Sequence, residues 1–284
     1  MTADPRTAPR RRPSFALPPN TCDAHCHVFG PADRFPYAPS RTYTPEDAPK
    51  EALRALHDQL GISRAVIVQA SCHGTDNAAM LDCLRSDPKR YRGVAIVDDS
   101  FTDAQYRELH EAGVRGVRFN FMPHLGASAD VGLMNRVIDR IKGLGWHVVL
   151  HLHHTVIIPM SEAIQKLPLP FIIDHMGRVP ADAGVAQPPV RALLELAKNE
   201  RCWIKVCGSE RIAMPPYTAA IPIAAALVKA GGDRVLWGTD FPHPNSTHDA
   251  DEAELVELVP QFAPDAADRQ RVLVDNPARL YDFD

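Results

Sequence analysis

The sequence predicts a single-domain (β/α)8 barrel of the TIM type, and three observations support this. Short apolar runs recur eight times, each is followed by a stretch with helical spacing, and no linker separates them. A chain of 284 residues with 45% hydrophobic residues suits one such barrel. An open doubly wound sheet is the alternative, but that fold usually carries a glycine-rich phosphate loop after its first strand, and this sequence has none.

The predicted strands are near-continuous apolar runs such as "HVVLHL", which are typical of strands buried on both faces of a parallel sheet. Their ranges are Cys22–Val28, Arg64–Ser71, Arg92–Asp98, Gly116–Asn120, His147–His153, Phe171–His175, Trp203–Cys207 and Val235–Asp240.

Helix caps and stops mark the stretches between the strands. Thr102 or Asp103 can cap one helix, and Gly61 and Gly113 each follow the end of one. The predicted helices are Glu51–Leu60, Asn77–Ser86, Gln105–Glu111, Val131–Gly143, Met160–Leu167, Pro189–Asn199, Tyr217–Ala230, Asp251–Phe262 and Ala266–Tyr281.

Composition narrows the cellular setting and the partners. Residues 1–20 predict a flexible tail rich in proline and arginine, ahead of a barrel over residues 21–284. Arg11 and Arg12 resemble a twin-arginine export signal, but Pro18 and Pro19 interrupt the apolar segment that such a signal needs, so we expect a cytoplasmic protein. The net charge of -4 indicates no nucleic-acid partner, and no apolar run is long enough to cross a membrane. Six cysteines without a CxxC pair indicate reduced thiols, and monomer and homodimer both stay open.

Polar residues stand at the C-terminal ends of nearly all predicted strands, where barrel enzymes carry their catalytic groups. A single strand histidine is usually structural, but scattered core histidines would not coincide at one rim. His25 and His27 are two residues apart and so share a face of the first strand. The residues at this rim are His25, His27, Ser71, His73, Arg118, Asn120, His151, His153, Asp174, His175, Arg211 and Asp240.

Neutral imidazoles and a carboxylate are ligands that Zn²⁺ prefers. His25, His27, His151 and Asp240 therefore form a candidate set for one Zn²⁺ or another divalent metal, with His175 beside it. A metal-independent site is the alternative. No lysine ends the fourth strand, which argues against a two-metal site bridged by a carbamate.

Three arginines, Arg118, Arg178 and Arg211, follow strands four, six and seven, and Tyr43 lies in the long first loop. Arginine binds carboxylates in a bidentate manner and keeps its charge at any working pH. Their convergence predicts a small anionic substrate, and the stretch "QASCHGTDN" at 69–77 adds polar groups that could hold a ring substituent.

At these motifs the sequence resembles the amidohydrolase superfamily, and within it the 2-pyrone-4,6-dicarboxylate lactonase group with its sulfomuconolactone hydrolase relatives. The matching stretches are "DAHCHVFGP", "VIVQASCHGTDN", "GVRFNF", "IDHMGR", "WGTDFPHPN" and "NPARLY". The resemblance implies a lactone hydrolase of bacterial aromatic catabolism, in which Asp240 is the general base for water. It implies that His25, His27 and His175 polarise the lactone carbonyl. Substrate contacts would be Tyr43, Ser71, His73, Arg118, Arg178 and Arg211.

Two positions depart from the pyrone lactonase pattern. His124 stands where that group carries a further arginine, so we expect it among the substrate contacts. His151 stands where the group carries a tyrosine, and it restores the histidine and aspartate set of metal-dependent members. A zinc lactonase of the 4-sulfomuconolactone type and a metal-dependent decarboxylase are therefore alternatives. A sugar-lactone enzyme and a catalytically silent binding protein are further ones.

Overall fold

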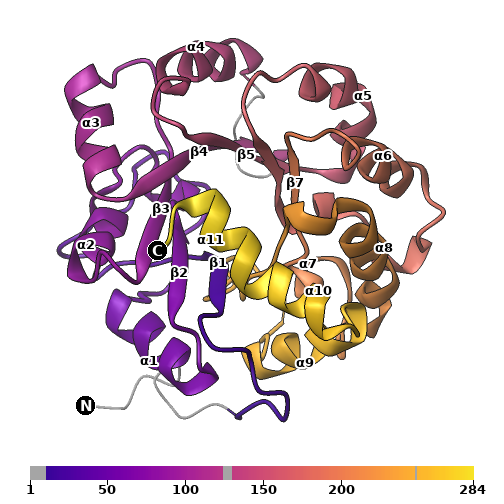
Figure 1. The fold of residues 1–284 in the computed structure, drawn as a ribbon. Coiled ribbons are helices and arrows are strands. Elements are labelled where there is room, and N and C mark those ends of the chain that lie inside the picture. Colours follow the sequence, from indigo (N-terminus) through magenta and orange to yellow (C-terminus); the bar gives the residue numbers. More distant parts are fainter. Residues whose placement is uncertain (1–10, 124–129, 247) are drawn as a thin grey trace.

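The computed structural model describes residues 11–123, 130–246 and 248–284. It confirms the predicted (β/α)8 barrel: eight parallel strands pair in chain order, with helices around them (Figure 1). The Ala24 amide donates to the Trp237 carbonyl oxygen at 2.8 Å, which joins the first strand to the segment after the last. The strands are β1 Cys22–Cys26, β2 Arg64–Val68, β3 Tyr91–Ala95, β4 Val114–Phe121, β5 His147–Leu152, β6 Phe171–Ile173, β7 Cys202–Lys205 and β8 Val235–Leu236.

Helices cover the outer face of the sheet, and apolar side chains fill both the barrel interior and the space beneath the helices. The six cysteines are all buried and free. No helix in the described ranges is long and apolar enough to cross a membrane. The helices are α1 Lys50–Leu60, α2 Ala78–Ser86, α3 Asp103–Glu111, α4 Val131–Ile141, α5 His154–Gln165, α6 Pro188–Leu196, α7 Ser209–Ile212, α8 Ile221–Gly231, α9 Glu252–Phe262, α10 Ala266–Gln270 and α11 Asn276–Tyr281.

The C-terminal segment closes one end of the barrel, so the opposite end is left for a site. Figure 1 shows α11 lying across the barrel. Tyr281 packs into the interior cluster and against His147, the first residue of β5, with ring centroids 5.1 Å apart. The opposite end carries the C-terminal ends of the strands. In the described part of the tail, the amide of Ser14 binds Glu257 of α9 at 3.0 Å.

Most strands end two to four residues earlier than predicted, because the polar residues after them turn across the barrel mouth instead of continuing the ladder. Ser71–His73 form a 3₁₀ turn and Asp174–Arg178 an irregular one. The fifth helix begins at His154 rather than Met160 and contains Pro159. These turns direct the side chains of the site.

Candidate active site

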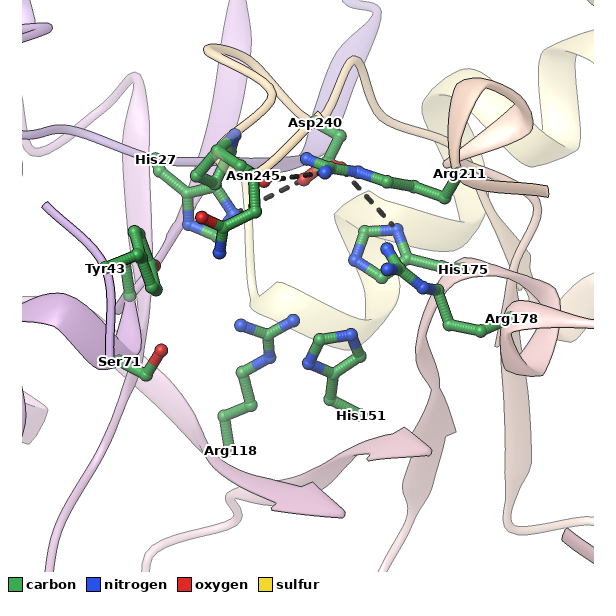
Figure 2. Close-up of a pocket in the computed structure, with 12 residues that line it drawn as sticks. His27, Tyr43, Ser71, Arg118, His151, His175, Arg178, Arg211, Asp240 and Asn245 are labelled. Carbon is green, nitrogen blue, oxygen red and sulfur yellow. Dashed lines mark hydrogen bonds and ion pairs between the residues drawn. The ribbon is translucent and has the colours of Figure 1, made fainter. Parts of the chain in front are cut away.

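Polar side chains from several strand ends meet in one cavity at the C-terminal rim (Figure 2). About 410 Å³ of atom-free space lies over this lining, a volume that includes solvent at the open mouth. His25 is fully buried directly behind this lining, beside His27 and His175. The predicted site residues that line the cavity are His27, Tyr43, Ser71, Arg118, His151, His175, Arg178, Arg211 and Asp240.

The structure does not bring His73 to this cavity, because the 3₁₀ turn that replaces the predicted strand end directs it elsewhere. Its Nδ1 lies 3.2 Å from the carbonyl oxygen of Pro36, and its ring packs on Tyr37 with centroids 4.8 Å apart. His124, which is also a predicted substrate contact, lies outside the described residues.

Asp240 follows β8 in a loop that is hydrogen-bonded to β1. Its amide donates to the carbonyl oxygen of His25 at 2.8 Å, and the amide of His27 donates to the carbonyl oxygen of Phe241 at 2.8 Å. Asp240 has a φ of 62°, in the left-handed region that costs a non-glycine residue roughly 1–2 kcal/mol. The paired backbones hold this conformation and keep the carboxylate next to the two histidines.

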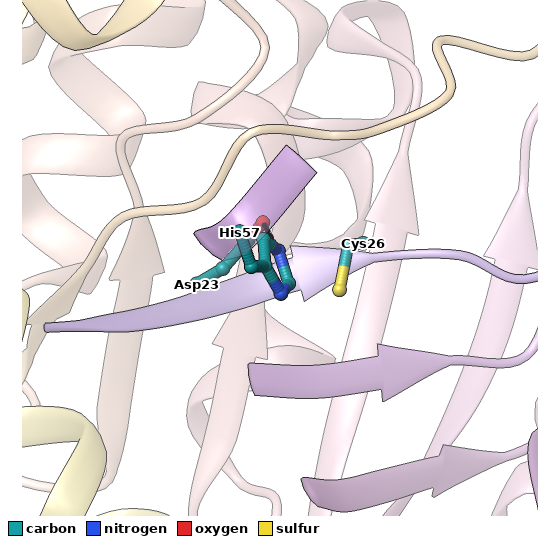
Figure 3. Close-up of side chains that lie close together, drawn as sticks. All are labelled: Asp23, Cys26 and His57. Atoms are coloured by element: carbon teal, nitrogen blue, oxygen red, sulfur yellow. Dashed lines mark hydrogen bonds and ion pairs between the residues drawn. The ribbon is translucent and has the colours of Figure 1, made fainter. Parts of the chain in front are cut away.

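A buried carboxylate, Asp23, ties β1 to the loop after β8 and to α1. Its Oδ1 accepts hydrogen bonds from the amides of His25 and Thr239, each at 3.0 Å. Its Oδ2 lies 2.5 Å from the Thr239 hydroxyl and 3.0 Å from Nε2 of His57 (Figure 3). The close approach of Asp23 requires a glycine at position 238, because a Cβ there would lie only 2.7 Å from Asp23 Oδ1. Asp23 therefore holds β1 against the loop after β8 that carries Asp240.

Asp23 and His57 also form a compact group with Cys26, shown in Figure 3. Both oxygens of Asp23 already accept hydrogen bonds, and the Cys26 thiol lies 3.5 Å from the carbonyl oxygen of Val66. Burial raises the pKa of the Cys26 thiol, which disfavours the thiolate that a metal requires. The hydrogen bonds of Asp23 therefore give this group a role in bracing the strand.

An arginine and a histidine lie against the two oxygens of the Asp240 carboxylate. Its Oδ2 accepts a hydrogen bond from Nε of Arg211 at 2.6 Å, and its Oδ1 lies 3.3 Å from Nε2 of His27. Burial alone would raise the pKa of Asp240, but the Arg211 guanidinium and the nearby histidines outweigh it and hold the pKa well below its usual range. The group is therefore ionised at neutral pH, and Oδ1 is the oxygen not bound by Arg211.

His175 and Arg178 are placed by an unusual turn after β6. Residues 175–178 all have positive φ values, from 50° to 65°, although only Gly177 is suited to them. Such strain concentrates at functional sites. It brings Nδ1 of His175 to 3.4 Å from the Cys207 sulfur and 3.9 Å from Asp240 Oδ2. Burial holds the pKa of His175 well below its usual range, so this imidazole is neutral.

His151 on β5 lines the cavity near Arg118 (Figure 2). Its Nδ1 lies 2.9 Å from the side-chain oxygen of Asn120, and its buried Nε2 has no hydrogen-bond partner among the described residues. Burial, reinforced by Arg118, holds the pKa of His151 well below its usual range. A neutral imidazole that donates from Nδ1 leaves the Nε2 lone pair free toward the cavity.

The three predicted arginines all reach the cavity, with different partners. Nε of Arg118 binds Asp174 at 3.0 Å, and Arg211 binds Asp240 and the carbonyl oxygen of Pro244. Burial and the nearby Arg211 lower the pKa of Arg178 to about 10, which still leaves it charged at neutral pH. Three guanidinium groups against one cavity carboxylate make the cavity electropositive, as an anionic ligand requires.

A second buried layer holds Arg211. Glu210 Oε1 lies 3.2 Å from Arg211 Nε and 3.4 Å from His243 Nδ1, and His243 Nε2 lies 3.4 Å from Glu252 Oε1. Burial would lower the pKa of His243, but its bonds to the two glutamates raise it to about 9. Charge therefore alternates in sign from Asp240 through this layer to Glu252.

The metal prediction can be tested on the hydrogen bonds of the ligand set. Ligand atoms of His25, His27 and Asp240 all lie within 4.8 Å of one another, in a group that does not include His151. Nδ1 of His27 lies 2.7 Å from the carbonyl oxygen of Val68 and must donate, so its Nε2 is free to bind. Nδ1 of His25 instead lies 3.1 Å from the Lys205 ammonium, a donor, and 3.4 Å from Oδ1 of Asp174, an acceptor. The spacing suits a divalent ion, but the Lys205 charge against His25 opposes one.

Lys205, Glu210 and His243 were not identified from the sequence. Lys205 did leave a signal, because it stands inside the apolar stretch "WIKVCG", where an unpaired charge would be costly. Glu210 and His243 are neighbours of Arg211 and Asp240 in the chain, but their mutual contact depends on the fold.

The sequence matches the Amidohydrolase family over residues 22–283. The chain is similar to a 2-pyrone-4,6-dicarboxylate hydrolase of Comamonas testosteroni, with 43% identity over 95% of this chain and 92% of that relative. It is also similar to a 4-sulfomuconolactone hydrolase of Rhizobium radiobacter, with 41% identity over 98% of this chain and 96% of the relative. A solved structure, described as a probable 2-pyrone-4,6-dicarboxylic acid hydrolase from Acinetobacter baumannii with citric acid bound, has a TM-score of 0.82 and 26% identity. The match spans 93% of this chain and 100% of the Acinetobacter baumannii chain.

Proposed function

Because the chain belongs to the amidohydrolase family, we propose that it is a lactonase, a carboxylic-ester hydrolase that opens a carboxylated lactone such as 2-pyrone-4,6-dicarboxylate. The observation that carries this proposal is the cavity itself. One ionised carboxylate, Asp240, faces the neutral imidazoles of His151 and His175 and three guanidinium groups around one cavity. The citric acid bound to the Acinetobacter baumannii structure supports a polycarboxylate ligand.

In the proposed reaction Asp240 accepts a proton from water through Oδ1, and the water oxygen bonds to the lactone carbonyl carbon. Negative charge then develops on the carbonyl oxygen, where His175 and the cavity guanidinium groups are the candidates to stabilise it. The ring carbon–oxygen bond breaks, and the leaving enolate oxygen takes up the proton. An enolate is a good leaving group, so a carboxylate of low pKa suffices as the base.

The arginines orient the substrate. Arg118 and Arg178 have guanidinium nitrogens that can bind substrate carboxylates, with Tyr43 and Ser71 facing them across the cavity (Figure 2). The reaction uses no step at the predicted Zn²⁺ site of His25, His27, His151 and Asp240, because the hydrogen bonds of His25 do not fit a metal ligand.

The test is an assay of the purified protein with 2-pyrone-4,6-dicarboxylate. Ring absorbance should fall, and one proton should be released for each ring opened, because the new carboxylic acid ionises. An uncharged lactone of the same ring is the control and should react far more slowly. Release of CO₂ in place of ring opening would indicate the decarboxylase alternative, and binding without turnover would indicate a silent protein; either result overturns the proposal.

A second candidate substrate is 4-sulfomuconolactone, favoured by the 41% identity to the Rhizobium radiobacter hydrolase. A sulfonate and a carboxylate are both anions that guanidinium groups bind, so the cavity chemistry serves either. The ratio of kcat/KM for the two lactones decides between them.

A further inference from the structure

Lys205 is the last residue of β7, and its side chain is fully buried behind the cavity. Its ammonium Nζ lies 3.1 Å from Nδ1 of His25 and 3.1 Å from Oδ1 of Asp174. A buried lysine is costly unless each of its protons has an acceptor. The Asp174 carboxylate and the His25 imidazole nitrogen stand against two of its three protons.

Nδ1 of His25 has two neighbours that make opposite demands. Asp174 Oδ1, at 3.4 Å, would accept a proton from Nδ1. The Lys205 ammonium, at 3.1 Å, can only donate one. Both demands cannot be met, because Nδ1 either carries a proton and donates or has a lone pair and accepts. The lysine is the closer of the two, and Asp174 is already supplied by Lys205 and Arg118.

His25 is fully buried, and its Nδ1 is the ring nitrogen that meets the Lys205 ammonium. With Nδ1 accepting from Lys205, the ring proton must reside on Nε2. That nitrogen is buried, has no other hydrogen-bond partner in the described part of the chain, and faces Asp240 Oδ1 at 3.6 Å. A short movement would close this approach to a hydrogen bond.

We propose that Lys205 is a positioning residue that holds the proton of His25 on Nε2, so that His25 acts as a donor to Asp240 and not as a metal ligand. The two histidines at the end of β1 then carry their ring protons on different nitrogens. His27 donates to the backbone through Nδ1 and presents Nε2 to the cavity, whereas His25 accepts from Lys205 at Nδ1 and carries its proton on Nε2. The catalytic consequence, alignment of the base, rests on the proposed lactonase function; the proton position does not.

The first test needs no substitution in the measured protein. Nitrogen-15 NMR of the imidazole side chains distinguishes a proton on Nδ1 from one on Nε2, and the spectrum of His25→Asn assigns the His25 signals. We expect wild-type His25 to be neutral at pH 7 with its proton on Nε2. A proton on Nδ1 would overturn the proposal.

The second test removes the donor. In Lys205→Met the ring proton of His25 should move to Nδ1 and bind Asp174, which frees Nε2 beside Nε2 of His27 and a carboxylate oxygen of Asp240. Affinity for Zn²⁺, titrated as zinc chloride against a chelating dye, should rise at least tenfold. Lys205→Arg keeps a donor and should keep both the Nε2 proton and the wild-type zinc affinity. Lys229→Met, at an exposed site on α8, is the matched control and should change neither.

An unchanged proton position and zinc affinity in folded Lys205→Met would contradict the proposal, as would a Lys205→Arg variant that behaves like Lys205→Met. The wild-type spectrum decides the matter if these variants do not fold. The lactone assay is independent of both measurements. A protein that carries the Nε2 proton but opens no lactone would retain this inference and lose the proposed function, and the reverse result would do the opposite.

Discussion

Two buried carboxylates, Asp174 and Asp240, lie on either side of His25 in nearly matching surroundings. Each has one oxygen bound to the Nε of an arginine: Asp174 to Arg118 at 3.0 Å, and Asp240 to Arg211 at 2.6 Å. Each has its other oxygen next to a different nitrogen of the His25 ring, at 3.4 Å and 3.6 Å. In both cases burial would raise the pKa and neighbouring cations hold it well below its usual range.

The two carboxylates differ in their exposure to the cavity and in their contact with Lys205. Asp240 lines the cavity, whereas Asp174 is sealed behind it and its second oxygen is bound by Lys205. Charge and pKa therefore do not identify the base in this protein. The base is the carboxylate that lines the cavity and has one oxygen bound by neither an arginine nor a lysine.

The largest expected effect comes from Asp240→Asn. An amide cannot accept the proton of water, so kcat should fall about 10³-fold or more, within the range of general-base losses. Stability should fall less than in Asp174→Asn, because Arg211 keeps Glu210 as a partner. Steady-state rates and thermal unfolding measure the two effects. A variant that keeps more than about a tenth of the wild-type rate would show that the base lies elsewhere. Such a rate corresponds to an increase in the activation barrier of less than roughly 1.4 kcal/mol.

Asp174→Asn should have the opposite profile. It leaves Lys205 and Arg118 buried without their counter-charge, which costs about 3–5 kcal/mol of unfolding free energy. Urea denaturation at pH 7 measures this loss. If Asp174→Asn proved as stable as Asp240→Asn, the two carboxylates would not differ in structural role.

Much of this comparison could be anticipated from the sequence. Asp174 and Asp240 were both placed at strand ends, because apolar runs bounded by polar residues show where buried strands stop. The rim of the barrel and most of its lining follow from that pattern and from the rule that catalytic groups gather at the C-terminal ends of the strands.

The difference between the two carboxylates could not be predicted from the sequence. It depends on which cation each one meets, and Lys205 reaches Asp174 only once β7 has paired beside β6. The turn that places His175 was equally hidden, because His175 and Met176 adopt positive φ values that their own preferences oppose. The 3₁₀ turn at Ser71–His73 is likewise not visible in the sequence, and His73 lies outside the cavity lining.

A smaller effect is expected at Arg178. Arg118 and Arg211 are each bound to a carboxylate, but no ion pair to Arg178 is found within the described ranges. Its guanidinium is therefore the one most available to substrate. Arg178→Met should raise KM about 10-fold to 100-fold, with kcat within about threefold, since a charged hydrogen bond contributes about 1.5–3 kcal/mol. Arg191→Met, on the exposed face of α6, is the control. A fall in kcat with unchanged KM would assign Arg178 to the transition state instead.

The smallest effect is expected from acid. Because the pKa of Asp240 is depressed, the carboxylate stays ionised as the pH falls through the usual carboxyl range, and kcat/KM should vary less than about twofold between pH 5 and 8. The same sign applies to stability. The contribution of Asp174 and Asp240 is present above the pKa of an unfolded aspartate, near 3.9, and is lost only as the pH falls through their lower folded values.

The alkaline side should behave differently, because there the binding groups titrate and not the base. Arg178, with its pKa lowered to about 10, loses its charge as the pH rises through that value, so KM should increase while kcat holds. Arg178→Met should abolish that increase. A pH profile of kcat, which reports the enzyme–substrate complex, with an acidic limb at about pH 4 would mean that substrate binding withdraws Arg211 from Asp240 and restores an ordinary carboxyl pKa. In that case the match between the two carboxylates would hold only for the empty cavity.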